Sequence, residues 1–316
     1  MSRPHVLTVS KLPPFLMEPL VAAFEVHDRL HETDPAAFAK VAPHIRGLVG
    51  GGESLVSGSL IGSLPALEII SIMGVGYDKV DVKAALARRI PVTHTPGVLN
   101  DEVADLAIGL MLSIARRIPQ ADKYTRAGRW AAEGPVPLSR KVSGARLGIV
   151  GLGRIGQAIA SRAEAFGMSI AYNSRSEKKG VPYRFYPTAT GLAAAVDFMI
   201  VITPGGEGTR HLINAEVLAA LGSKGYLINI ARGSVVDEAA LVDALKKGVI
   251  AGAALDVFEK EPHPLEALLT MDNVVLTPHI ASGTRETRQA MADLALGNLQ
   301  AHFSGMKLLS PVPEWG

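Results

Sequence analysis

The sequence predicts an α/β fold built from two doubly wound parallel sheets with a cleft between them. Short apolar, β-branched runs alternate with helix-length stretches along the 316 residues, which is the pattern of βαβ units. A chain of this length holds about two domains at roughly 150 residues each. The alternation is interrupted once, by a long amphipathic stretch at 101–118 that we interpret as a hinge helix. We therefore expect one parallel sheet on each side of this stretch.

The two series of apolar runs define the expected strands. The first series predicts strands at 5–9, 24–26, 47–50, 68–72 and 92–94. The second predicts about six strands, at 146–150, 169–172, 198–202, 226–230, 250–254 and 274–277. Residues 119–144 are polar, rich in proline and without clear periodicity, so we interpret them as an excursion from the domain. The last periodic stretch, 284–303, has the apolar spacing of a helix with one buried face.

Composition excludes several classes of function. Lys and Arg number 32 against 30 Asp and Glu, so there is no basic field of the kind that nucleic acids require. The absence of cysteine excludes disulfides, thiolate nucleophiles and Cys-ligated metals. His27 and His31 form the only close histidine pair and lack a third ligand, so a metal site is not expected. The chemistry must come from His, carboxylates, Arg, Lys or a cofactor.

Neither a membrane nor a secretory destination is predicted. The longest apolar run, 106–115, is shorter than the roughly 20 residues that a bilayer-spanning helix needs. Residues 1–20 are broken by prolines and charges and lack the apolar core of a signal peptide. We therefore expect a soluble, cytoplasmic protein with no nucleic-acid or membrane partner.

A glycine-rich turn follows the first strand of the second series. Gly151, Gly153 and Gly156 form G-x-G-x-x-G between a strand and a helix, the context in which this pattern binds a dinucleotide. Gly151 allows the tight turn, Gly153 lets the backbone approach the pyrophosphate, and Gly156 lets the helix pack against the strand. The helix N-terminus then favours the phosphates. The pattern alone is compatible with an ordinary strand–helix turn, but its flanking strand, helix and further alternations favour dinucleotide binding.

The end of the next strand favours NADPH over NADH. An NAD-binding domain usually has an acidic residue there, about 20 positions after the glycines, to bind the ribose 2′-hydroxyl. Here the strand ends in Asn173, Ser174, Arg175 and Ser176, which offer hydrogen-bond donors and a cation to a 2′-phosphate. The alternative interpretation is a solvated basic turn without a role in binding.

Four titratable residues follow strands of the second series: Arg232, Asp256, Glu261 and His279. Each could be an ordinary surface, capping or turn residue. They follow the carboxyl ends of parallel strands, where ligands bind in such sheets. Together they suit the reduction of a 2-keto acid, which needs a cation for the carboxylate and a proton donor for the carbonyl oxygen. The planar guanidinium of Arg232 can pair with a carboxylate, and His279 can act as the general acid with Glu261 favouring its protonated form. Asp256 can accept from the nicotinamide carboxamide.

A second group of expected contacts comes from the first series of strands. Residues 73–76, Met-Gly-Val-Gly, follow the strand at 68–72 and can present backbone N–H groups to a substrate carboxylate. Backbone amides in successive residues form anion-binding concavities of this kind. We expect this segment to face the catalytic residues across the cleft.

These motifs resemble those of the D-isomer-specific 2-hydroxyacid dehydrogenases. The resemblance rests on the glycine turn and on three further motifs, Asn-Ile-Ala-Arg-Gly at 229–233, Leu-Asp-Val-Phe-Glu-Lys-Glu-Pro at 255–262 and Thr-Pro-His-Ile-Ala-Ser at 277–282. It covers nearly the whole chain. One departure is Gly205–Gly206 after Pro204, where many relatives carry a bulkier pair.

The resemblance, with the motifs, implies a set of site residues. The catalytic residues are expected to be Arg232, Glu261 and His279. Cofactor contacts are expected from Gly151, Leu152, Gly153, Arg154, Ile155, Gly156, Asn173, Ser174, Arg175, Ser176, Thr203, Pro204, Thr209, Ile230, Ala231, Asp256, Ser282 and Gly283. Substrate contacts are expected from Leu55, Gly74, Val75, Gly76, Arg232, His279 and Ser282.

The resemblance also implies the domain organisation. A Rossmann cofactor domain at 100–283 is expected to be inserted in a flavodoxin-like substrate domain formed by 1–99 and 284–316. A homodimer is expected on the hinge helix and the arm at 119–144. Leu55 and Val56 are expected in the pocket wall. Trp130 of the partner's arm is a further candidate there, although packing at the dimer interface is the simpler interpretation.

Within the family, the sequence looks most similar to NADPH-linked glyoxylate/hydroxypyruvate reductases and plant-type hydroxyphenylpyruvate reductases. Hydroxypyruvate or glyoxylate is therefore the expected substrate, with an aryl or alkyl 2-keto acid as the alternative. A non-enzymatic NADP(H)-sensing protein is a remote alternative from another class, since a sensor has no need to keep Arg232, Glu261 and His279 together.

Overall fold

The computed structural model describes residues 3–316, which form two compact α/β units. Unit 1 comprises 1–99 and 284–316, and unit 2 comprises 100–283. Each unit contains one fully parallel sheet, so the predicted fold class is confirmed. Within the described residues, no helix combines the length and apolarity needed to cross a membrane.

The sheet of unit 1 has five strands in the order β2-β1-β3-β4-β5. The strands are β1 (His5–Thr8), β2 (Glu25–Asp28), β3 (Ile45–Gly51), β4 (Ile69–Met73) and β5 (Val92–Thr93). Strand β4 is buried along its whole length, which explains its continuous apolar sequence. The strand order reverses at β1 and β3, and the carboxyl ends beside such a reversal are where open α/β sheets place ligand-binding loops.

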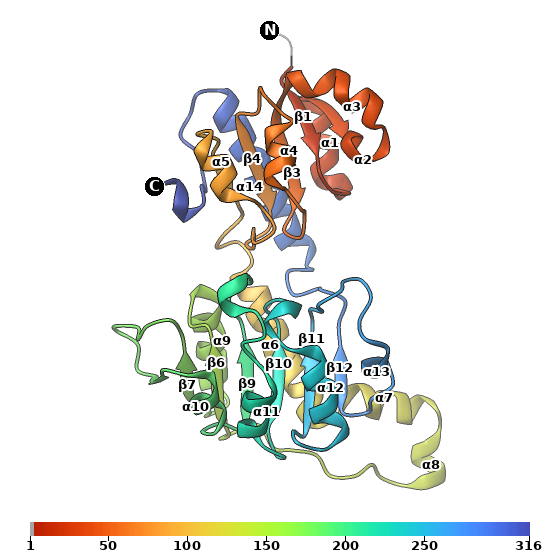
Figure 1. Cartoon of the computed structure of the whole chain (residues 1–316). Coiled ribbons are helices and arrows are strands. Elements are labelled where there is room, and N and C mark those ends of the chain that lie inside the picture. Colours follow the sequence, from red (N-terminus) through yellow and green to blue (C-terminus); the bar gives the residue numbers. More distant parts are fainter. Residues whose placement is uncertain (1–2) are drawn as a thin grey trace. The chain divides into compact units, whose positions relative to one another are not determined.

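Helices cover both faces of this sheet (Figure 1). They are α1 (Pro14–Ala23), α2 (Leu30–Thr33), α3 (Pro35–Val41), α4 (Gly58–Gly62), α5 (Val82–Ala87) and α14 (Arg285–Phe303). The C-terminal helix α14 packs on β4, where Ser71 Oγ donates to the Ala295 carbonyl at 2.9 Å. Thr284 caps α14 by accepting from Thr287 N. The structure places this helix in unit 1.

The sheet of unit 2 has seven strands in the order β12-β11-β10-β9-β6-β7-β8. The strands are β6 (Arg146–Val150), β7 (Ser169–Asn173), β8 (Arg184–Tyr186), β9 (Phe198–Val201), β10 (Tyr226–Asn229), β11 (Gly252–Leu255) and β12 (Val274–Leu276). The expectation of about six strands missed β8. This edge strand has three residues, one of them exposed, and therefore lacks the apolar run that marks its neighbours.

Helices of unit 2 also lie on both faces of its sheet (Figure 1). They are α6 (Asn100–Arg116), α7 (Ile118–Arg126), α8 (Arg129–Glu133), α9 (Arg154–Glu164), α10 (Ala189–Ala193), α11 (Ala215–Leu221), α12 (Glu238–Lys246) and α13 (Glu266–Leu269). Helices α10, α11 and α12 pack in one apolar core, whereas α6 and α9 pack on each other. The carboxyl ends of β6, β10, β11 and β12 lead into the segments that carry the predicted cofactor and catalytic residues.

The middle of the chain differs from expectation in two details. The predicted helix at 101–118 ends at Arg116, because Arg117 adopts a left-handed conformation with φ 54°. The excursion at 119–144 is partly helical, with α7 and α8 projecting from the rest of unit 2 (Figure 1). None of the residues in either helix is buried, so the repeating pattern that reveals a packed helix is absent from the sequence.

We expect a pair of histidines to make the stability of unit 1 depend on pH. His5 Nδ1 lies 3.0 Å from His27 Nε2, and the two rings are stacked. Burial lowers the pKa of His27, with a further decrease from His5 and an opposing effect from Glu25. When folding lowers the pKa of a base, the folded state disfavours the protonated form. The stability is then full above the unfolded pKa, about 6.5 for histidine, and decreases as the pH falls below it.

We expect the melting temperature to fall between pH 7.5 and pH 5.5, and to fall less in a His27→Gln variant. Thermal unfolding at both pH values measures the difference. Lys40→Gln, which removes an exposed cation of α3 that does not titrate in this range, is the control and should keep the parent's pH dependence. An identical decrease in the parent and His27→Gln would refute the assignment.

Candidate active site and cofactor site

The glycine turn between β6 and α9 has room only for glycine at two positions. Gly151 has φ +102°, and a Cβ there would lie 2.8 Å from the Ile202 carbonyl oxygen. A Cβ on Gly156 would collide with the carbonyl oxygen of Gly151. A Cβ on Gly153 would meet open space, so the backbone at the start of α9 is accessible to a ligand. This geometry fits a pyrophosphate at the helix N-terminus.

The turn after β7 presents the cation of Arg175, and the strand itself ends in Asn173 rather than in a carboxylate. Asn173 is buried, and its side-chain amide donates to the Tyr186 carbonyl of β8 at 2.8 Å. Ser174 Oγ donates to the Ser176 carbonyl, which shapes the turn. Arg175 is exposed. Asn173 thus anchors the turn, and of the four predicted residues Arg175 and Ser176 are the exposed ones that a 2′-phosphate could reach.

The loop after β9, residues 203–211, is called here the cofactor-facing loop. Gly206 has φ +122°, a conformation that other residues rarely adopt. Thr209 Oγ1 donates to the Pro204 carbonyl at 2.8 Å and lies 3.2 Å from that of Gly206. The departure from the family pattern at Gly205–Gly206 therefore falls within a loop that Thr209 closes on itself.

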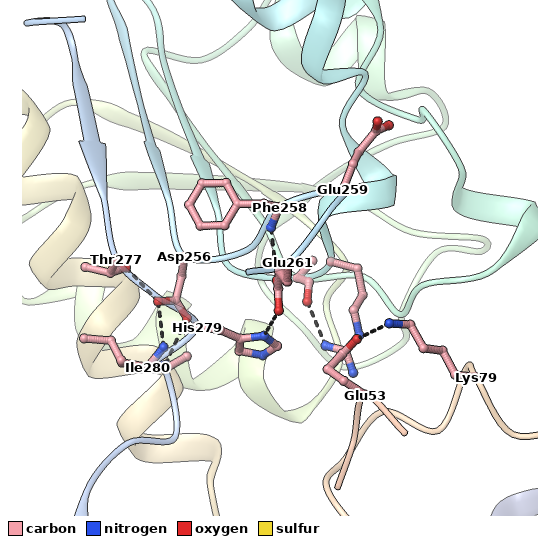
Figure 2. A network of polar contacts seen from close by, with 12 residues as sticks. Glu53, Lys79, Asp256, Phe258, Glu259, Glu261, Thr277, His279 and Ile280 are labelled. Atoms are coloured by element: carbon pink, nitrogen blue, oxygen red, sulfur yellow. Dashed lines mark hydrogen bonds and ion pairs between the residues drawn. The ribbon is translucent and has the colours of Figure 1, made fainter. Parts of the chain in front are cut away.

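The structure brings Glu261 and His279 together. Glu261 lies in the loop 257–262 after β11, called here the Glu261 loop, and His279 follows β12. Nδ1 of His279 lies 2.7 Å from Oε2 of Glu261 (Figure 2). Phe258 N donates to Oε1 of the same carboxylate at 3.1 Å. Glu261 therefore holds His279 through Nδ1, and Nε2 is the ring nitrogen that does not contact this carboxylate.

The surroundings keep Glu261 ionised. Burial acts to raise its pKa, but the hydrogen bond and charge of His279 outweigh burial. The Phe258 N–H and the charge of Arg232 add to the decrease, so the pKa of Glu261 lies below its usual value. An ionised carboxylate at this distance favours the imidazolium form of His279, which is the form that can donate a proton.

Asp256 holds the loop that carries His279. It is fully buried, and its Oδ1 accepts from Thr277 Oγ1 at 2.6 Å and from Ile280 N at 2.9 Å (Figure 2). Oδ2 accepts from Ala281 N at 2.9 Å. Burial raises the pKa of Asp256, against the effect of these hydrogen bonds. The three donors give Asp256 a structural role, and its contact with the nicotinamide carboxamide stays a prediction.

Backbone strain marks the position of His279. Its φ is +53°, in the left-handed region that residues other than glycine seldom occupy. Its N–H donates to the Asp256 carbonyl at 2.9 Å, which fixes this conformation. The turn directs the imidazole toward Glu261 rather than along the line of β12 (Figure 2).

Arg232 follows β10 and lies in a turn held by Asn229. Asn229 Nδ2 donates to the Arg232 carbonyl at 3.0 Å, and Asn229 Oδ1 accepts from Ala231 N. Nη1 of Arg232 donates to the Ala231 carbonyl at 2.8 Å. A Cβ on the next residue, Gly233, would collide with the Phe258 carbonyl, so this turn packs directly against the Glu261 loop.

The predicted substrate contacts of unit 1 lie after β3 and β4. Gly74 N donates to the Ile72 carbonyl, whereas Val75 N and Gly76 N have no hydrogen-bond acceptor within residues 3–316. A Cβ on Gly74 would lie 2.6 Å from Gly52 Cα, so the two loops pack closely. Val75 and Gly76 can therefore present N–H groups to an anion.

The expected pocket wall needs one correction. Leu55 is 68% exposed and can line a pocket. Val56 is fully buried in the core of unit 1 and cannot, so that expectation is wrong. The alternation of side chains in extended backbone explains why neighbouring residues differ in this way.

The remaining predicted residues divide by exposure. Leu152, Ile230 and Ala231 are buried and could contact a cofactor only through the backbone. Arg154 and Gly283 are exposed, and Ile155, Ser282 and Thr203 are partly buried.

Sequence reasoning missed Asn229, Phe258 and Thr277, which position Arg232, Glu261 and Asp256. Two of them act through the backbone or a small hydroxyl, which have no signature in a sequence.

The fold and the glycine turn define a dinucleotide-binding α/β protein. Residues 108–281 match the family described as D-isomer specific 2-hydroxyacid dehydrogenase, NAD binding domain. The chain belongs to this family.

Similar proteins extend the match to nearly the whole chain. Glyoxylate/hydroxypyruvate reductase A of Arabidopsis thaliana is 53% identical over 268 residues, covering 85% of each chain. Hydroxyphenylpyruvate reductase of Plectranthus scutellarioides is 52% identical over 283 residues, 89% of this chain and 90% of that one. Among solved structures, the NADPH-dependent glyoxylate/hydroxypyruvate reductase of Sinorhizobium meliloti, in complex with NADP and malonate, is 50% identical with a TM-score of 0.94 and covers 99% of this chain and 98% of its own.

Proposed function

We propose that the protein reduces a small 2-keto acid, hydroxypyruvate or glyoxylate, to the D-2-hydroxy acid with NADPH. The observation that carries this proposal is the Glu261–His279 pair, 2.7 Å apart, on the same unit as Arg232 and the glycine turn. The activities named for the Arabidopsis and Sinorhizobium relatives support it. Residues 100–283 would bind the dinucleotide, and 1–99 with 284–316 would bind the substrate.

Each residue of the site has a role in this reaction. Bound NADPH would supply the hydride to the keto carbon. Arg232 pairs with the substrate carboxylate and polarises the ketone. His279 donates a proton from Nε2 to the carbonyl oxygen, while Glu261 holds Nδ1 and stabilises the imidazolium. On unit 1, the N–H groups of Val75 and Gly76 are donors that suit a carboxylate.

A screen of 2-keto acids tests the proposal. NADPH oxidation is followed with glyoxylate, hydroxypyruvate and hydroxyphenylpyruvate, and kcat/KM is compared, because pocket shape discriminates such substrates. We expect the two small acids to be reduced most efficiently. Preference for hydroxyphenylpyruvate would support the second candidate, which the 52% identity to the Plectranthus reductase favours. NADPH binding without turnover of any 2-keto acid would support the sensor alternative.

The turn after β7 supports NADPH as the cofactor. We expect Arg175→Ala to raise the KM for NADPH by about tenfold and to leave the KM for NADH nearly unchanged, because a charge-assisted hydrogen bond to the 2′-phosphate is lost. Initial rates with each cofactor measure this. Lys224→Ala removes an exposed cation of the same unit and is the control. A parent enzyme that prefers NADH would contradict the assignment.

The arm supports a homodimer. Four large apolar side chains in and beside α7 and α8 are exposed: Ile118, Trp130, Val136 and Leu138. Exposed apolar side chains concentrated in this way are typical of an interaction surface. We infer that a second copy of the chain covers them, including Trp130. Light scattering tests this, and a monomeric mass would refute it.

A cytoplasmic location stays a prediction, tested by cell fractionation.

A further inference from the structure

A contact between a histidine and a carboxylate links two loops of unit 2, the cofactor-facing loop and the Glu261 loop. His211, at the end of the cofactor-facing loop, has Nε2 2.5 Å from Oε1 of Glu259 in the Glu261 loop. Asp237 Oδ2 lies 3.9 Å from the other ring nitrogen of His211. Neither His211 nor Glu259 has a place in the mechanism above. Their side chains are about one-third exposed or less, so the pair is partly shielded from water.

Glu259 is held from two directions. Its backbone N–H donates to Oε1 of Glu238 at 2.7 Å, and its side chain pairs with His211. Glu238 begins α12 and is only 4% exposed. Burial raises the pKa of Glu238, with an opposing effect from the Glu259 N–H and further increases from the charges of Glu259 and Glu261. Burial of the Glu238 carboxyl group is energetically unfavourable, and its hydrogen bond from the Glu259 N–H compensates for part of that burial.

Glu259 lies two residues from Glu261, and the two side chains point to opposite sides of the loop (Figure 2). One carboxylate pairs with His279 and the other with His211. The peptide group between Phe258 and Glu259 packs on the Arg232 turn, since a Cβ on Gly233 would collide with the Phe258 carbonyl and the Glu259 nitrogen. A shift of Glu259 would therefore move Glu261 relative to both His279 and Arg232.

We propose that the His211–Glu259 pair is a positioning contact that holds the cofactor-facing loop and the Glu261 loop in one arrangement, with Glu238 anchoring the Glu259 backbone. The proposal rests on the proposed function, because it assigns loop 203–211 to the cofactor. Binding of the dinucleotide and alignment of Glu261 with His279 thereby depend on the same contact. Glu259 and His211 act through their neighbours and touch neither substrate nor cofactor.

A double-mutant cycle tests the contact with His211→Gln, Glu259→Gln and the double variant. Each single variant should raise the Kd for NADPH about threefold to tenfold and lower kcat/KM for the keto acid about tenfold or more, as misplaced catalytic groups do. The double variant should be no worse than the poorer single one, because the same contact is lost. Asp243→Asn, which removes an exposed ion pair with Lys247 on α12, is the control and should behave as the parent.

Two readouts separate positioning from mere stabilisation of the fold. If the pair only stabilised the fold, the variants would melt at lower temperature while the folded enzyme kept the parent's Kd, KM and pH profile. Unchanged Kd for NADPH in both single variants, or additive losses in the double variant, would overturn the proposal. A parent enzyme that binds NADPH but reduces no 2-keto acid would refute the proposed function, and the Kd values of the variants would still test the positioning contact. A parent enzyme that binds neither NADPH nor NADH would refute both the proposed function and the positioning contact.

Discussion

Replacing His279 by Asn should lower kcat for keto-acid reduction by about 10²–10⁴-fold, the usual contribution of a positioned general acid. Asparagine is the informative substitution because it tolerates the left-handed φ of +53° at this position, so the loop held by Asp256 keeps its shape. It cannot donate a proton to a forming alkoxide. The Kd for NADPH should stay within about twofold of the parent value, since the glycine turn is untouched.

The control for this variant is His302→Asn. His302 also pairs with a carboxylate, that of Glu68 at 3.3 Å, but in unit 1 and outside the proposed site. Its loss should leave kcat unchanged.

Glu261→Gln provides a second readout, because removal of the negative charge beside His279 should move the basic limb of the pH profile to lower pH. Turnover by His279→Asn at the parent rate would exclude His279 as the general acid.

Replacing Arg232 by Lys should lower kcat/KM for the keto acid by about a hundredfold while the Kd for NADPH changes little. Lysine keeps the positive charge but loses the planar fork that pairs with a carboxylate, and a hydrogen bond to a charged group is worth about 1.5–3 kcal/mol. The turn itself should persist, because Asn229 holds it through the backbone of Ala231 and Arg232. Steady-state kinetics and a fluorescence titration with NADPH measure the two quantities.

Arg146→Lys is the matched control for Arg232→Lys. Arg146 also forms a two-pronged pair, with Asp197 at 3.0 and 3.1 Å, but at the amino end of β6, opposite the edge from which the site residues emerge. It should keep the parent's kcat/KM. An Arg232→Lys enzyme as efficient as the parent would show that charge alone suffices at this position.

Most strands were predictable because they are largely buried. Strands such as β4 and β9 are buried at every residue, and a continuous apolar run is the direct consequence. Strand β8 and helices α7 and α8 escaped prediction for the converse reason. They bury little or nothing within the chain, so no apolar period marks them. The arm's exposed Trp130 and Leu138 have no covering partner among the residues of this chain that the structure describes.

The sequence by itself determined the two parallel sheets, the glycine turn and the residue types that a 2-keto acid reduction needs, because burial period and strand-end position are local properties. Only the tertiary structure decided which side chains meet. It joined Glu261 to His279 at 2.7 Å, gave Asp256 three donors from the His279 loop, and paired His211 with Glu259 across 48 positions of sequence. Such contacts depend on the turns after neighbouring strands, which no periodicity encodes.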